Sequence, residues 1–148
     1  MEKKNLELEQ RVWKRVRGEE QPSAVSVQSL MAAEQDEAAV HLMLSRQMQG
    51  KEKALLRRMF EEDRCHAAML RGMNELMTGK RLAARTAPPT PQTPETTLRK
   101  SYARKLQALS EYESRCADGE YGAVFSKMAQ QEKEHCAMIL EILGSLQR

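Results

Sequence analysis

Two segments of this sequence carry apolar residues at helical spacing that give way, at mid-length, to an acid followed three residues later by a histidine. The first stripe passes through Asp63 and His66, and the second passes through Glu132 and His135. Residues spaced by three or four lie on one face of an α-helix, so each pair points the same way as its apolar neighbours. Burying an unpaired charge costs several kcal/mol. We therefore expect these four side chains to face polar partners inside a helical protein.

Glycine and proline residues divide the chain into long helical segments. The spacing of apolar residues predicts a short helix over 3–17 and four long helices, over 24–48, 52–78, 97–117 and 121–146. The segment 85–97, RTAPPTPQTPETT, separates the second and third long helices, and its four prolines exclude helix and favour an extended connector. The other two connections are short. We therefore expect two antiparallel hairpins joined by a connector that runs the length of a bundle.

These connections predict an all-α fold, a four-helix bundle of up-down-down-up topology with a long proline-rich crossover. We expect an N-terminal amphipathic helix within 1–20 and the bundle over 24–148, divided into a first hairpin (24–79), the crossover (80–96) and a second hairpin (97–148). A shift of 69 residues superposes Asp63 on Glu132 and His66 on His135. This match indicates that the two hairpins are a duplication.

The other two long helices also place polar residues at the centres of their inward stripes. The first contributes Glu34, Glu37 and His41, and the third contributes Lys105 and Tyr112. A shift of 71 residues places Glu34 opposite Lys105 and His41 opposite Tyr112. All three histidines of the chain therefore lie on inward stripes. A lone inward histidine is usually a hydrogen-bonded core residue, but the doubled acid-x-x-His pattern favours a metal site.

This layout resembles the ferritin-like superfamily, and in particular its rubrerythrin-like di-iron carboxylate branch. The resemblance covers 24–146 and lies in a Glu, an aromatic residue seven positions later and an acid-x-x-His about 28 residues after the Glu, a pattern that the family carries twice. It implies a site for iron or manganese that reacts with oxygen or peroxide and takes electrons from a separate donor. Carried onto this chain, the implied ligands are Glu34 as a terminal carboxylate, Asp63 and Glu132 as bridges, and His66 and His135 as imidazoles.

Two positions depart from the family pattern. Asp63 replaces a Glu and is one methylene shorter, and Lys105 stands where the third helix of the family supplies a carboxylate. An ammonium repels a metal ion, so we expect Lys105 to reach Asp63 or Glu132 and to take the place of a second ion. Glu37, one turn after Glu34, is the expected compensating ligand. At most one tightly held ion is then expected, on the side of Glu34 and Glu37.

Three residues are expected beside the metal without binding it: His41, Lys105 and Tyr112. His41 stands at the position of the family's tyrosine, and the hydroxyl of Tyr112 is expected to meet a bridging carboxylate. Because Lys105 replaces a carboxylate ligand of the second metal position, we expect no tightly held ion there. His135 is then expected to be free or hydrogen-bonded to a carboxylate.

Two functions of different classes follow from these residues. The first is a ferritin-like protein that binds iron or manganese, with one ion in place of two, and acts as a rubrerythrin-type oxidoreductase or peroxidase. The second is a degenerate bundle, metal-free or with a single metal, that acts as a structural or interaction protein. In this second case Lys105 neutralises Asp63 and Glu132 in place of an ion.

Composition narrows the partners. The 24 basic and 21 acidic residues interleave along the chain and leave a formal net charge of +3, so we expect neither nucleic acid nor a membrane as partner. The three cysteines form no CxxC pair, which argues against a zinc ribbon or an attached rubredoxin-type centre. The N-terminal residues lack the apolar core of a signal peptide, so we expect a cytoplasmic protein. A homodimer is expected, with the N-terminal helix as one candidate contact.

Overall fold

A computed structural model of the chain describes residues 26–84 and 87–147. These residues form four α-helices and no strand: α2 (Val27–Gln47), α3 (Gly50–Thr78), α4 (Pro94–Ser114) and α5 (Gly122–Leu146). The prediction of an all-α fold is confirmed for this part of the chain, whereas the helix predicted within 1–20 lies outside the described residues. None of the described helices is long and apolar enough to cross a membrane.

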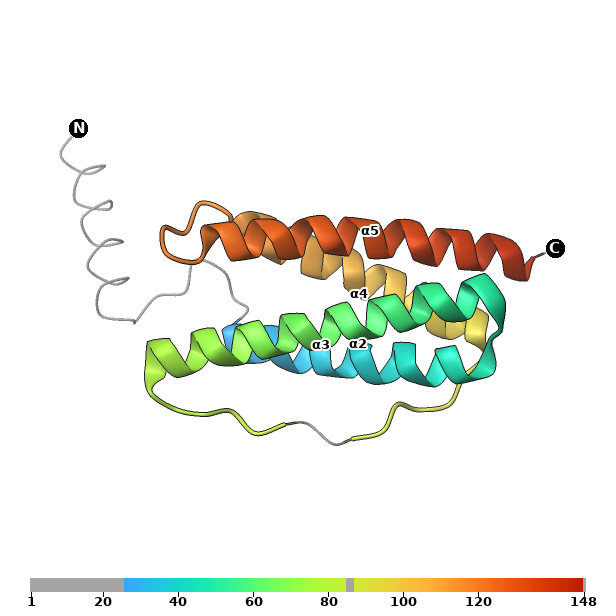
Figure 1. Cartoon of the computed structure of the whole chain (residues 1–148), viewed down its shortest axis with the longest axis horizontal. Helices are drawn as coiled ribbons and strands as arrows, with labels where there is room; N and C mark the ends of the chain where they lie inside the picture. The colour runs from blue at the N-terminus through green and yellow to red at the C-terminus, as the bar shows by residue number, and fades with distance from the viewer. Residues whose placement is uncertain (1–25, 85–86, 148) are drawn as a thin grey trace, which may run out of the picture.

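The four helices form two antiparallel pairs. Figure 1 shows α2 and α3 side by side in opposite directions, with α4 and α5 forming the second pair. The pairs meet through contacts of α3 with α5 and of α2 with α4. Residues 80–84 and 87–93 run along one side of the molecule and return the chain to its other end, so α4 runs in the same direction as α3 (Figure 1). This arrangement is compatible with a four-helix bundle.

Local sequence signals set the ends of α2 and α3. The hydroxyl of Ser26 caps α2 by accepting a hydrogen bond from the amide of Ser29 at 3.1 Å. Gly79 ends α3 in a left-handed conformation with φ 72°, and its amide donates to the carbonyl of Glu75 at 2.8 Å. Glycine adopts this conformation without the steric penalty of a Cβ atom, which explains its place at the helix end.

The start of α4 corrects the prediction for the crossover. The helix begins at Pro94, so the crossover covers 80–93 and is shorter than the predicted 80–96. Backbone N–H groups in the first turn of a helix have no helical acceptor, so a proline, which has no N–H group, loses no hydrogen bond there. The fixed φ of proline also suits a helix. Thr93 caps this end by accepting a hydrogen bond from the amide of Thr96 at 3.3 Å. The expectation that all four prolines exclude helix is therefore wrong for Pro94. The helix also ends at Ser114, before the predicted end at 117.

The interior contains two apolar clusters with a layer of buried polar side chains between them. The first cluster consists of Val27, Leu30, Met31, Ala67, Leu70, Met73, Tyr112, Phe125, Met128 and Ala129. The second consists of Leu44, Met48, Leu56, Met59, Leu98, Met138, Ile139 and Ile142. The layers alternate because each helix carries its buried polar residues near the middle of its inward stripe.

Replacing Ile139 with Ala should lower the free energy of unfolding by about 2 to 5 kcal/mol, because this side chain is fully buried and its truncation leaves a cavity. The matched control is Leu140→Ala at the neighbouring position, where the side chain is 55% exposed. Urea denaturation followed by circular dichroism measures both variants. Equal losses would contradict the inward orientation of the Ile139 stripe.

Candidate metal centre

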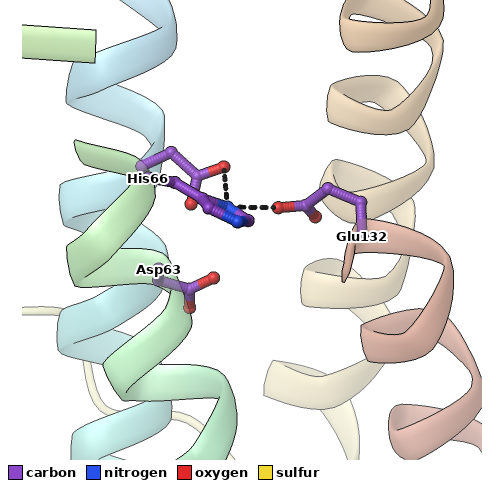
Figure 2. A group of neighbouring side chains, drawn as sticks. Asp63, His66 and Glu132 are labelled. Carbon is purple, nitrogen blue, oxygen red and sulfur yellow. Dashed lines mark ion pairs between the residues drawn. The ribbon is translucent and has the colours of Figure 1, made fainter. Parts of the chain in front are cut away.

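Four buried side chains from three helices converge at the polar layer. Glu34 comes from α2, Asp63 and His66 come from α3, and Glu132 comes from α5. Each offers one ligand atom, and these atoms all lie within 4.8 Å of one another. Figure 2 shows His66 and Glu132 pointing toward each other across the space between their helices, with Asp63 one turn along α3 from His66. We call Glu34, Asp63, His66 and Glu132 the four-residue cluster.

His66 lies between two carboxylates of the cluster. Its Nδ1 is 3.5 Å from Glu34 Oε1 and 3.3 Å from Glu132 Oε1, and the ion pairs are drawn in Figure 2. Its Nε2 lies 2.7 Å from Oε1 of Gln131. Burial lowers the pKa of His66, but the two carboxylates outweigh burial and raise it to about 10. In the absence of a metal ion, His66 is therefore protonated at neutral pH.

The ammonium of Lys105 occupies the other side of the cluster. It donates a hydrogen bond to Asp63 Oδ1 and lies 3.2 Å from Glu132 Oε2. Burial lowers the pKa of this side chain, but the negative charges of Asp63, Glu34 and Glu132 raise it well above its ordinary value. The prediction that Lys105 faces inward and reaches these carboxylates is confirmed.

Asp63 is hydrogen-bonded through both of its oxygens. Lys105 binds Oδ1, and Nδ1 of His41 lies 2.6 Å from Oδ2. The Nε2 of His41 lies 2.9 Å from the hydroxyl of Ser101, which donates to Glu37 Oε2 at 2.6 Å. His41 thus contacts a cluster residue from outside the cluster, as predicted, and a chain of hydrogen bonds holds Asp63 in one orientation.

The structure does not bring Glu37 into the cluster, which corrects the prediction of a compensating ligand. The Oε1 atom of Glu37 accepts a hydrogen bond from Arg104, and Oε2 accepts the one from Ser101. Both partners belong to α4, so Glu37 faces that helix and not the centre of the cluster. A helix position three residues on is rotated by about 60°, which is enough to change the neighbour that a side chain meets.

His135 also lies outside the cluster. Its Nε2 is 3.1 Å from Glu62 Oε1, and its Nδ1 is 3.5 Å from Asp63 Oδ1. Burial and the positive charge of Lys105 lower the pKa of His135 below its ordinary value, so the imidazole is neutral. Of the two expected states, free or hydrogen-bonded to a carboxylate, the structure shows the second with Glu62 as partner, and it does not place His135 among the four clustered ligand residues.

Tyr112 contacts a different carboxylate from the one predicted. Its hydroxyl donates to Glu34 Oε1 at 2.6 Å, whereas a bridging carboxylate was expected. Burial and the negative charge of Glu34 raise the pKa of the phenol well above its ordinary value, so the hydroxyl keeps its proton. Burial raises the pKa of Glu34 itself, but Lys105 and the hydrogen bonds from His66 and Tyr112 outweigh burial and lower it.

Four residues that contact the site were not predicted from the sequence as site residues: Glu62, Ser101, Arg104 and Gln131. Three of them directly precede Asp63, Lys105 and Glu132 in the chain. A side chain one position before an inward residue lies at the border of the stripe, where it reaches a neighbouring helix. Ser101 lies on the inward stripe itself and is fully buried, so its position was the available signal.

Three buried atoms of the cluster have no hydrogen-bond partner among the described residues, Glu34 Oε2, His66 Nδ1 and Glu132 Oε2, although the last two lie in the ion pairs given above. Buried polar atoms normally have a partner, so three exceptions in one cluster call for an explanation. Burial raises the pKa of Glu132 to about 7, which reflects the cost of a charged carboxylate at this place. One cation bound by these atoms would satisfy all three. The donor set, carboxylate oxygens with one imidazole, suits a divalent transition metal.

No protein-family model matches the chain, and neither a curated protein nor a solved structure is significantly similar to it.

Metal-free protein should become less stable as the pH rises from about 6.5 to about 10. The pKa of His66 is 6.5 in the unfolded chain and about 10 in the folded one, so the folded state retains a proton that the unfolded state loses in this range. The contribution of His66 is complete below pH 6.5 and is lost as the pH passes through the folded pKa. Urea midpoints of chelator-treated protein at several pH values measure this effect. His66→Gln lacks this titration, and a fall of the same size in that variant would assign the effect to other groups.

Proposed function

We propose that this chain is a ferritin-like metal protein that binds one divalent ion, iron or manganese, through Glu34, His66 and Glu132. Asp63 is the fourth proposed ligand. Its two oxygens are hydrogen-bonded to Lys105 and His41, so one of these contacts gives way when Asp63 binds the ion. The observation that carries the proposal is the set of three buried ligand atoms without hydrogen-bond partners in one cluster. His66 Nδ1 and Glu132 Oε2 also lie in ion pairs, whereas Glu34 Oε2 lies in none of those described, and a buried carboxylate oxygen without a partner costs free energy.

The charge of the cluster supports one ion over two. Glu34, Asp63 and Glu132 carry three negative charges, and Lys105 adds one positive charge, which leaves −2 when His66 is neutral. One divalent ion balances this charge, whereas two would leave an excess of positive charge in a buried place. Binding displaces the proton of His66, so affinity is expected to rise with pH.

The ferritin-like part of the proposal is supported by the connections between the helices. A long crossover joins two antiparallel pairs, and the acid-x-x-His residues of α3 and α5 face each other across the polar layer. Ferritin-like bundles combine one long crossover with metal ligands projecting inward from facing helices. The match between the halves, with Asp63 and Glu132 as equivalent residues, agrees with this proposal.

Redox chemistry of rubrerythrin type is the activity that fits such a site. Iron held by the four-residue cluster would supply the redox chemistry for reduction of oxygen or peroxide, with electrons from a separate donor. The four-residue cluster would hold the ion, and the hydroxyl of Tyr112 keeps Glu34 oriented. A homodimer remains a prediction.

The second candidate is a metal-free bundle with a structural or interaction role. It is favoured by the contacts of Lys105 with two carboxylates and by the pKa of about 10 for His66. Two positive charges then compensate the buried carboxylates without an ion. The two candidates differ in one measurable property, the metal content of the protein.

Protein purified without chelator should contain about one ion of iron or manganese per chain, as the ligand count of the cluster implies. Metal analysis and titration of the stripped protein with Mn²⁺ measure this. Glu34→Gln and His66→Ala should weaken binding by about tenfold or more, because each removes a ligand. Glu37→Gln is the matched control and should bind normally, since Glu37 lies against Arg104. Protein that neither contains nor binds metal would favour the second candidate.

Lys105→Glu should raise the metal content from about one ion toward about two per chain, because the cluster gains a carboxylate at the position that the family uses. The charge of the cluster becomes −4, which two divalent ions neutralise. The same variant should gain more thermal stability from added metal than the natural protein does. Lys105→Met removes the ammonium without adding a carboxylate, so it distinguishes the two effects of Lys105→Glu. The Lys105→Met variant should bind one ion. An unchanged metal content in Lys105→Glu would show that Lys105 does not stand in for an ion.

A further inference from the structure

A cavity of about 240 Å³ lies between α2 and α4. Its wall includes three residues of the buried site, Glu34, Lys105 and Tyr112. It also includes two small residues, Ala33 of α2 and Ala108 of α4. Ala33 is exposed and Ala108 is half-buried. The cavity therefore extends from the surface between α2 and α4 toward the polar layer.

We propose that this cavity is the route by which a divalent cation enters and leaves the four-residue cluster, an inference that rests on the proposed function. Glu34 is the only cluster residue in the wall of the cavity, and its Oε2 atom is buried without a hydrogen-bond partner. An ion that passes along the cavity therefore meets a free ligand atom first. Tyr112 holds the other oxygen of Glu34, so the carboxylate keeps its position while the ion arrives.

The charges along the wall favour a cation over an anion. Three carboxylates line the cavity, those of Glu34, Glu37 and Glu111, against two cationic side chains, Arg104 and Lys105. Both cations are bound to carboxylates, Arg104 to Glu37 and Lys105 to Asp63. The lining residues therefore sum to a formal charge of −1, which favours a cation over an anion.

The opposite face of the bundle offers a less direct approach. A groove between α3 and α5 is lined by Arg58, Ala123, Ser126, Lys127, Gln130, Gln131 and Glu134. None of these belongs to the cluster, and only Gln131 contacts it, through His66 Nε2. Arg58 joins the two helices there, because it binds Glu62 of α3 and Glu134 of α5. Arg58 and Glu134 of these ion pairs are part of the lining of the groove.

Filling the cavity should slow metal exchange without changing affinity. In Ala33→Leu and Ala108→Leu a larger side chain narrows the cavity, while the cluster keeps its ligands. We expect the association and dissociation rates of Co²⁺ to fall together by about tenfold, with a dissociation constant within about twofold of the natural protein. Stopped-flow absorption after mixing with Co²⁺, and after mixing the loaded protein with chelator, measures both rates. Ala33→Leu changes an exposed helix position, so the test does not depend on the fold tolerating Ala108→Leu.

Ala123→Leu is the matched control, because it fills the groove between α3 and α5 and should leave both rates unchanged. Unchanged rates in both cavity variants, or a slower rate in the control, would overturn the route while the metal site stands. A natural protein that binds no Co²⁺ would overturn the route together with the proposed function. A slower association rate with an equally weakened dissociation constant would mean that the substitution disturbs the ligands, and it would also overturn the route.

Discussion

The ammonium of Lys105 lies among the buried carboxylates at the centre of the bundle, and the rest of the polar layer depends on this contact. It extends from α4 to Asp63 of α3 and Glu132 of α5, so one side chain compensates charges on two other helices. Removing the positive charge would leave Asp63 buried without its lysine and the three carboxylates with only His66 as a positive partner in the cluster, which costs free energy in a protein interior. The two apolar clusters pack on either side of this layer, in which Lys105 offsets part of the negative charge.

The ligands of the cluster differ in how freely they can meet a cation. Asp63 is held by Lys105 on one oxygen and by His41 on the other, and His41 is held in turn by Ser101. Glu34 and Glu132 each keep one oxygen without a hydrogen bond. The site therefore combines one carboxylate that is hydrogen-bonded through both oxygens, Asp63, with two that each keep one oxygen without a hydrogen bond, although that oxygen of Glu132 lies 3.2 Å from Lys105.

The helices and the main residues of the site could be predicted from the sequence because both depend on the spacing of inward positions. Asp63, His66 and Glu132 lie where the 3-4 pattern places them, and Lys105 meets the predicted acids. The pattern does not resolve the rotation of one helix against its neighbour. Glu37 therefore turned out to face Arg104, and Tyr112 turned out to bind Glu34. The start of α4 was missed because the number of prolines in the segment predicted no helix there. Thr93 caps the helix and Pro94 is its first residue.

The hydrogen bonds of the polar layer also bear on how the chain folds. His41 and His66 contact Asp63 and Glu34 within the α2–α3 pair, but the other partners of its buried carboxylates belong to the α4–α5 pair: Tyr112 for Glu34, Ser101 and Arg104 for Glu37, and Lys105 for Asp63. A pair of helices that docked alone would bury carboxylates without these partners, so a half-formed bundle is higher in free energy than either end state. The two pairs therefore depend on each other for these contacts, and we expect them to unfold as one cooperative unit, with the crossover keeping one pair close to the other.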